Sequence, residues 1–335
     1  MIAGAYEHRL QVFSSVRGIL GGGVVPPEVA APYRVGQGDW TLAQEPGFSW
    51  HHEIDRVFVA WPLHGATLTA GRQAVGWGRG VVFSAVDLFA PFSPLEADRE
   101  WRRGVDAVRL EVPLSDHTSV DGVVALGPSL DESAEMGRWR GYAGDVDIEV
   151  VGGRRARDWL GGVTSSAAVG PASVHGELVI FRAQDGPDLP PTPVVKGVAG
   201  TSYRFGLGPG IVTFLEYHYS GFGAPRPQEI LSQLADPAFL ARVLRGDVQI
   251  LGRHAITAIA SSDVSPEWTV GGQWLHAPND GSGVISPSAV LTVSDAVALH
   301  LSGYLSYGRP PVGTTLQSEY GARGNAVFVQ LRLYL

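Results

Sequence analysis

The C-terminal segment 325–335 alternates between aliphatic and other side chains with a period of two residues. Its odd positions from 327 to 335 are all aliphatic, whereas Gln330 and Arg332 stand between them. Successive side chains of a β-strand point to opposite faces, so this pattern predicts a strand with one apolar and one polar face. A chain built from many such strands must find an apolar environment for every apolar face.

The same two-residue period recurs along the chain. In segment 106–114 the even positions from 108 onward are aliphatic, whereas Arg109 and Glu111 occupy odd positions. Segments 145–150 and 296–307 repeat the pattern, and weaker versions bring the total to about 14 to 16 candidate strands. Short joints rich in Gly, Asn, Asp and Pro separate them. This spacing is typical of consecutive antiparallel hairpins rather than of strands joined by helices.

Composition favours a membrane barrel over a soluble sheet. Charged residues make up only 17% of the chain, against roughly 25% in average soluble domains. So many strands with one apolar face each would need a very large core and a charged exterior in a soluble protein. In a transmembrane barrel the apolar face meets lipid and the polar face lines water. We therefore expect one all-β domain over 1–335, a transmembrane antiparallel up-and-down β-barrel.

Several other protein classes are excluded or disfavoured. No stretch approaches the ~18 consecutive apolar residues that a membrane helix needs. The balance is acidic, with 33 Asp and Glu against 25 Lys and Arg, so a nucleic-acid partner is not expected. The absence of cysteine excludes disulfides and thiolate metal sites. Segment 1–20 lacks the basic and apolar regions of a signal peptide, so we expect a misassigned start, with a signal peptide or strand missing upstream, or a signal already removed.

One segment, 227–245, has the spacing of an amphipathic helix. Pro227 suits the first helical turn, and Gly246 suits the position after the last one. The Asp236-Pro237 step predicts a break into two short pieces. Such a segment would cap or plug a barrel, or would pack as an ordinary short helix against a sheet.

Segment 71–109 carries a distinctive pattern of Gly, aromatic, Pro and charged residues. The pattern consists of Gly71-Arg72-Gln73, Trp77-Gly78, Gly80, Asp87, Phe89, Pro91-Phe92, Pro94, Asp98-Arg99-Glu100 and Arg102-Arg103-Gly104-Val105-Asp106-Ala107-Val108-Arg109. It resembles a widespread class of Gram-negative outer-membrane porin-like barrels. The resemblance implies a location in the bacterial outer membrane, contact with outer-membrane lipids, insertion by the barrel assembly machinery and passage of small solutes.

Segment 80–104 is too long for a hairpin turn, and its prolines stiffen it. We hypothesise that this loop folds inward and that its charges pair with Arg72 and Arg109, which would narrow and polarise a pore. The alternative is a salt-bridge network that only pins the loop. The candidate pore-lining residues are Arg72, Asp87, Glu96, Asp98, Arg99, Glu100, Arg102, Arg103 and Arg109, with Glu111 and Arg332 also facing the lumen.

Aromatic residues lie near the ends of several candidate strands. Trp61, Trp77 and Trp274 are examples. Tryptophan and tyrosine are enriched where a membrane protein meets the lipid–water interface. These residues fit interfacial girdles, although ordinary core aromatics would give the same pattern.

No catalytic or metal site is predicted. The sequence contains no Gly-x-Ser-x-Gly elbow, phosphate-binding loop or His-Glu-x-x-His motif. His51, Glu53 and Asp55 could converge from one strand face, but a surface turn explains them as well. Glu216 and His218 share one face of a predicted strand without an identifiable serine. We therefore expect no enzyme and no cofactor.

The function predicted from the sequence is a channel for passive or weakly selective diffusion of small solutes. One alternative is a plugged barrel with a structural role or a role in binding lipid or polymer. Another is a soluble β-rich enzyme or carbohydrate-binding module.

Overall fold

The computed structural model describes residues 11–12, 32–36, 38–45, 48–95, 102–186 and 189–333. Fifteen strands form one antiparallel sheet in which every strand pairs with its neighbours in sequence. This agrees with the predicted number of strands and with up-and-down connectivity. The strands are β4 (Val57–Leu63), β5 (Ala66–Gln73), β6 (Val105–Ser115), β7 (Thr118–Ala125), β8 (Ala134–Ala143), β9 (Val146–Arg155), β10 (Asp158–Val169), β11 (Ala172–Ala183), β12 (Thr192–Phe205), β13 (Ile211–Ser220), β14 (His254–Asp263), β15 (Trp268–Ala277), β16 (Ser282–Ser294), β17 (Val297–Tyr307) and β18 (Ala326–Leu333).

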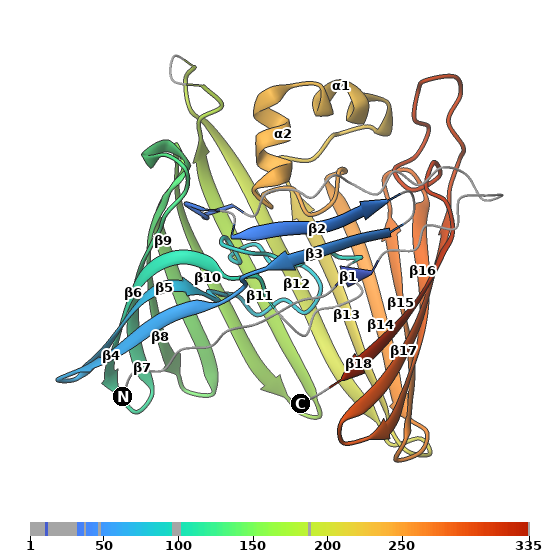
Figure 1. Cartoon of the computed structure of the whole chain (residues 1–335), viewed down its shortest axis with the longest axis horizontal. Coiled ribbons are helices and arrows are strands. Elements are labelled where there is room, and N and C mark those ends of the chain that lie inside the picture. Colours follow the sequence, from blue (N-terminus) through green and yellow to red (C-terminus); the bar gives the residue numbers. More distant parts are fainter. Residues whose placement is uncertain are drawn as a thin grey trace.

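The large sheet curls round so that it has an inside and an outside (Figure 1). Its edge strands are β4 and β18, and the pairings among the described residues do not join them. A separate three-stranded sheet has the order β1-β3-β2 and is drawn between the two edges in Figure 1. Its strands are β1 (Gln11–Val12), β2 (Asp39–Glu45) and β3 (Phe48–Glu53).

The two ends of the sheet differ in their connections. At the end drawn at the bottom of Figure 1 the strands are joined by tight links such as 116–117, 144–145 and 170–171. The opposite end carries the long connections 74–104, 221–253 and 308–325. The three longest connections between strands of the large sheet therefore lie at the same end.

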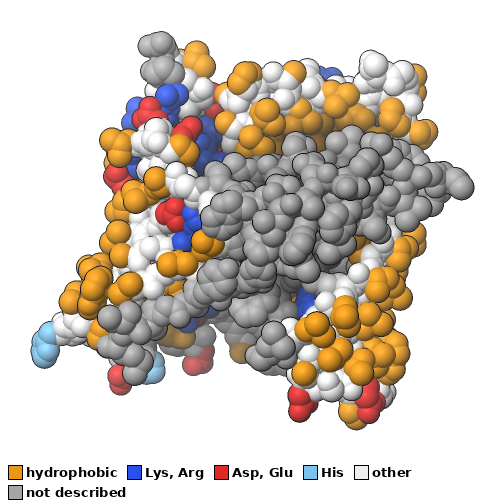
Figure 2. All heavy atoms as spheres, viewed as in Figure 1, with side chains coloured by type: hydrophobic (Ala, Val, Ile, Leu, Met, Phe, Trp, Pro, Cys, Tyr) orange, Lys and Arg blue, Asp and Glu red, His pale blue; other side chains and the backbone are white. Residues whose placement is uncertain are grey.

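The C-terminal strand has the alternation that the sequence predicts. Val329 keeps 68% of its surface exposed, and its odd-numbered neighbours in β18 are exposed as well. Gln330 and Arg332 are half-buried on the opposite face. β18 pairs with β17 in a regular register, Leu331 opposite Leu299. Val108, Leu110 and Leu114 of β6 are exposed in the same way, and Figure 2 shows hydrophobic side chains over much of the visible strand surface.

The hydrophobic core lies inside the curled sheet, at the end with the long connections. The connection from β5 to β6 folds inward, as predicted, and its Val75, Phe83 and Phe89 are buried. Inward-facing aliphatic residues of the wall complete this core. The core is therefore formed by the loop and the wall together. The wall residues of the core include Val105, Ala107, Val123, Ala125, Met136, Val151, Leu160, Val179, Phe181, Val198, Ala255, Leu275 and Val284.

Trp77 corrects one expectation from the sequence. It is only 3% exposed, and its ring packs edge-on against Phe89 with ring centroids 5.2 Å apart. The prediction that Trp77 belongs to an outer aromatic girdle is wrong, because β5 ends at Gln73 and Trp77 has already entered the interior. Trp61 and Trp274 are exposed on strands, as the girdle prediction requires.

The predicted helical segment is confirmed, including its break. A 3-10 turn, η2 (Pro227–Glu229), leads into α1 (Ile230–Leu234), and α2 (Pro237–Leu244) follows. Asp236 caps α2, since its side chain accepts a hydrogen bond of 2.9 Å from the amide of Ala238. No helix among the described residues is long and apolar enough to cross a bilayer.

Gly71 in β5 offers a test of the strand packing. Its φ is +121°, and a Cβ there would collide with the carbonyl oxygen of Val57 on β4. We expect Gly71→Ala to destabilise the protein by about 1–3 kcal/mol, measured by urea unfolding in detergent. Gly137→Ala is the matched control, because a Cβ there would have no neighbour closer than 3.8 Å. Equal stability of the two variants would contradict the packing of β4 against β5.

Candidate functional site

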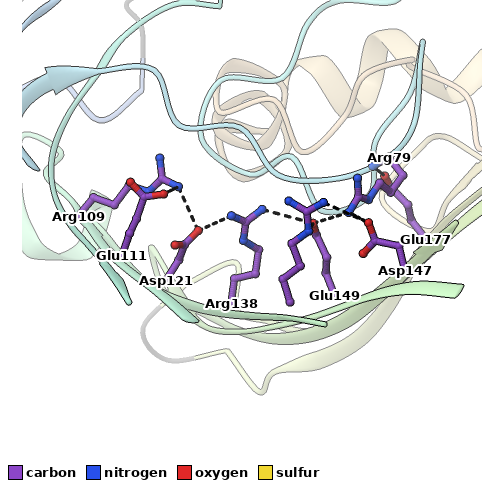
Figure 3. Close-up of polar contacts among 9 residues, drawn as sticks. Arg79, Arg109, Glu111, Asp121, Arg138, Asp147, Glu149 and Glu177 are labelled. Atoms are coloured by element: carbon purple, nitrogen blue, oxygen red, sulfur yellow. Dashed lines mark hydrogen bonds and ion pairs between the residues drawn. The ribbon is translucent and has the colours of Figure 1, made fainter. Parts of the chain in front are cut away.

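A row of paired charges runs along the inward face of the sheet at mid-height (Figure 3). Strands β6 to β9 supply most of these side chains, and the inward loop supplies one. Arginines and carboxylates alternate along the row, so each charge lies beside one of opposite sign. We call this row the charge ladder, and its members are Arg109, Glu111, Asp121, Arg138, Arg140, Asp147, Glu149 and Arg79.

The ladder is continuous from β6 to β9. Arg109 bonds Glu111 at 2.6 Å and Asp121 at 3.1 Å. Arg138 on β8 bonds the same Asp121 carboxylate and lies 3.5 Å from Glu149 on β9. The strand register explains this order, since Glu111 pairs with Asp121 across β6 and β7 and Asp121 pairs with Arg138 across β7 and β8.

The inward loop enters the ladder through Arg79. Its guanidinium bonds Asp147 at 2.5 Å and Glu149 at 2.9 Å. Arg138 in turn lies over the ring of Trp77, 5.4 Å from its centroid. The ladder is therefore the layer where the charged wall meets the apolar loop core.

The ladder is buried on one side and open on the other. The side chains of Asp121 and Glu149 are almost inaccessible, whereas Glu111 retains 41% and Arg140 39% of their side-chain surface. The exposed members lie farther from the loop along β6 and β8. Buried charges need partners, whereas exposed ones remain available to ions in water. The open side is the part of the ladder that a solute could meet.

Arg109 and Glu111 lie on the inward face and belong to the ladder, whereas their predicted role in lining a pore stays a prediction. Arg332 lies on the inward face of β18 and is half-buried. Arg72 lies elsewhere, because it shares the outward face with Val108 and is paired across β5 and β6 with Asp106 at 2.8 Å. The structure therefore places Arg72 and Arg109 on opposite faces of the sheet.

The candidate residues of the loop fall into two groups. Asp87 is buried and bonds Arg102, which also donates to the carbonyl of Ala90 at 2.8 Å. Burial raises the pKa of Asp87 to about 6, although Arg102 lowers it. Arg103, the residue after Arg102, is half-buried. Glu96, Asp98, Arg99 and Glu100 lie outside the described residues, so their predicted place in a constriction stays a prediction.

Sequence reasoning found part of the ladder and missed the rest. Asp147 and Glu149 stood out as the polar face of segment 145–150, although Asp145 lies in the turn before β9 rather than on the strand. Arg138 and Arg140 are two residues apart on β8, so a search for charges at period two would have identified them. Arg79 had no such signal, since its place depends on the path of the loop through the interior.

Glu216 and His218 share the inward face of β13, as predicted, but their side chains are not hydrogen-bonded to each other. His218 is fully buried and stacks on Phe83 with centroids 4.7 Å apart. Neither of its ring nitrogens has a hydrogen-bond partner among the described residues. Asp55, a third acidic candidate, bonds Arg34 at 3.2 Å. No group of three metal-ligating side chains occurs in the described part of the chain.

Ion pairs hold the long connections to the rim of the sheet, and hydrogen bonds hold them to each other. Arg242 of α2 is buried and bonds Asp158 at the start of β10 at 2.7 Å. In connection 308–325, the carboxylate of Glu319 accepts hydrogen bonds from the amides of Leu251 at 2.7 Å and Gly252 at 3.0 Å. The connections at this end are thus tied to the wall and to each other.

No protein-family model matches the sequence, and the search of curated proteins finds no significant relative. Solved structures of outer-membrane β-barrels are similar in fold. Acinetobacter baumannii OccAB1 gives a TM-score of 0.52 at 11% identity, covering 86% of this chain and 78% of its own. Pseudomonas aeruginosa OccK11 (OpdR) gives 0.51 at 10%, covering 84% and 80%. Wzi of Escherichia coli gives 0.51 at 11%, covering 77% and 67%.

These likenesses agree with the curled antiparallel sheet and establish the fold of an outer-membrane β-barrel for this chain. The sequence identities are too low to transfer a function. The resemblance of segment 71–109 to outer-membrane porin-like barrels stays a prediction from the sequence.

The burial of Glu319 between connections 308–325 and 221–253 predicts a pH dependence of stability. Burial raises the pKa of Glu319 from 4.5 to about 7. A carboxyl group with a raised pKa stabilises the fold fully below its ordinary pKa, and the contribution is lost as pH rises through the raised value. Glu319→Gln imitates the neutral form. We expect the thermal midpoint of the wild type to fall more than that of Glu319→Gln between about pH 5 and about pH 8.5; parallel curves would contradict this.

Proposed function

We propose that this protein is an outer-membrane channel through which small polar solutes diffuse with weak selectivity. The observation that carries the proposal is the contrast between the two faces of the sheet. Charged side chains of the ladder line the inside at mid-height, and two of them remain exposed. The outer face of the same strands carries exposed apolar residues at this level, such as Leu110, Val120 and Val150. A barrel in lipid needs this arrangement, because hydrocarbon surrounds it and water fills it. The fold of outer-membrane barrels supports the proposal.

The connections set the proposed orientation. Outer-membrane barrels have short turns on the periplasmic side and longer loops on the extracellular side. The tight links such as 116–117 and 144–145 would then face the periplasm, and the helices α1 and α2 the outside. Outer-membrane lipids and the barrel assembly machinery are the partners that this placement requires.

The charge balance of the ladder accounts for weak selectivity. Its arginines and its carboxylates are equal in number, and most are paired with each other. The exposed members, Glu111 and Arg140, have opposite signs. Rings of one sign exclude ions of the same sign, and a mixed lining does so only weakly. Small solutes of either charge could therefore pass.

Planar-bilayer recording tests the channel. The purified protein should show heat-modifiable migration on gels and stable conductance steps. Arg140→Ala should shift the reversal potential toward cation selectivity, and Glu111→Gln should shift it toward anion selectivity, because each removes one exposed charge from the lumen. A protein that is soluble without detergent, or variants whose reversal potential equals that of the wild type, would contradict the proposal.

Paired substitutions on β18 test which face meets lipid. We expect Val329→Arg to destabilise the protein in bilayers by roughly 2–4 kcal/mol, because an arginine would replace an aliphatic residue in hydrocarbon. Gln330→Arg, one residue along and inward, should change the stability by less than about 1 kcal/mol. Unfolding by denaturant in lipid vesicles measures both. Equal losses would show that the two faces do not meet different solvents.

A second candidate function is a barrel that binds a polymer instead of conducting. It is favoured by the apolar packing of the inward loop, whose Phe83 and Phe89 are buried in the interior. Wzi, which shares the fold, is described as a carbohydrate-binding barrel involved in group 1 capsule assembly. A heat-modifiable barrel that gives no conductance and binds a capsular polysaccharide would support this candidate against the channel.

A further inference from the structure

We propose that Glu177 and Glu216 form a carboxylate clamp that holds residues 79–86 across the interior and so sets the width of the passage. The inference rests on the proposed channel function and names the residues that position its constriction. Both carboxylates belong to the wall, Glu177 on β11 and Glu216 on β13. Both point at the backbone of the inward loop rather than at an arginine.

Glu177 accepts hydrogen bonds from both ends of the loop segment 79–86. One carboxylate oxygen, Oε1, accepts hydrogen bonds from the amides of Arg79 and Gly80, the latter at 2.8 Å. The other oxygen, Oε2, accepts from the Ser84 hydroxyl at 2.8 Å and from the Ala85 amide at 2.6 Å. One side chain thereby closes the loop segment into a ring against the wall.

Glu216 accepts hydrogen bonds from the middle of the same segment. Its Oε1 accepts from the amide of Val81, and its Oε2 accepts from the amides of Val82 at 2.8 Å and Phe83 at 3.2 Å. His175 on β11 lies 2.9 Å from the same carboxylate. The two glutamates together bind the loop backbone along its whole path past β11 and β13.

The physical basis is the anion-binding property of successive backbone amides. Consecutive N–H groups that point inward form a concave site for an anion. Here the wall supplies the anion and the loop supplies the amides. Glu177 is 5% exposed and Glu216 1%, so each carboxylate has lost its water. A buried carboxylate without such donors would destabilise the fold. The position of the loop and the burial of the two glutamates therefore depend on each other.

The clamp also places the charge that the loop contributes to the ladder. The amide of Arg79 is held by Glu177, while its guanidinium reaches Asp147 and Glu149. Gly78 allows this close approach, because a Cβ there would lie 2.8 Å from Oε1 of Glu177 and its φ is +105°. Release of the clamp would therefore widen the passage and withdraw Arg79 from the ladder at the same time.

Single-channel recording of Glu177→Gln, Glu216→Gln and the double variant tests the clamp. Each amide side chain keeps one acceptor oxygen but turns an NH2 group toward backbone donors, so the loop should come loose. We expect roughly a twofold rise in conductance with more current fluctuation, while heat-modifiable migration stays unchanged. Glu135→Gln is the matched control, since Glu135 is exposed on β8 and takes no part in the ladder or the clamp. Folded clamp variants with wild-type conductance would overturn the proposal.

A cross-link separates positioning from simple loss of structure. The chain contains no cysteine, so Phe83→Cys with His218→Cys, whose rings stack in the wild type, can be joined by a short thiol-reactive linker. In the double clamp variant the linker should restore the lower conductance. With the clamp intact it should change nothing, which provides a test even if the clamp variants fail to fold. A large drop on cross-linking the intact clamp would overturn the proposal, whereas a silent wild type would instead contradict the channel function.

Discussion

The two-residue period of the strands forces half of the wall side chains into one enclosed volume, and the rest of the structure depends on how that volume is filled. At the end with the long connections the wall presents aliphatic residues, and the inward loop fills the space with Val75, Phe83 and Phe89. At mid-height the inward side chains of the wall are charged, and Arg79 of the loop forms ion pairs with Asp147 and Glu149. One loop therefore has to match two different layers of the same wall.

Buried charge is compensated in three different ways in this molecule. In the ladder, arginines and carboxylates of neighbouring strands neutralise each other. At Glu177 and Glu216 the compensation comes from backbone amides of the loop. At the rim, Arg242 of α2 pairs with Asp158 while Leu240 and Leu244 of the same helix remain exposed. A buried charge that loses its partner is strongly destabilising. Each of these interactions therefore helps to hold a connection against the wall, and together they would give the proposed passage a defined shape.

The strands and the helical segment could be predicted because their signals are local. The alternation in 325–335 and the Asp236-Pro237 break depend only on residues near in sequence, and both appear in the structure. The inward loop was predicted, but the contacts that the structure shows for its described residues are not the predicted ones with Arg72 and Arg109. They join residues such as Arg79 and Glu177, which are far apart in the chain. Arg72 shows a related limit. A strand of uncertain register can present a residue to either face, and one position of shift moves it from the lumen to the outside.

The proposed channel requires an inward face of the sheet that meets water and an outward face that meets hydrocarbon. Adjacent residues of β6 measure this directly, because Leu110 is exposed on the outside and Glu111 lies in the ladder. Single cysteines at these two positions, in a chain that otherwise contains none, can be reacted with a water-soluble maleimide after reconstitution in lipid vesicles. We expect rapid labelling of Glu111→Cys and protection of Leu110→Cys. Equal labelling of both, or labelling of Leu110→Cys alone, would contradict this expectation.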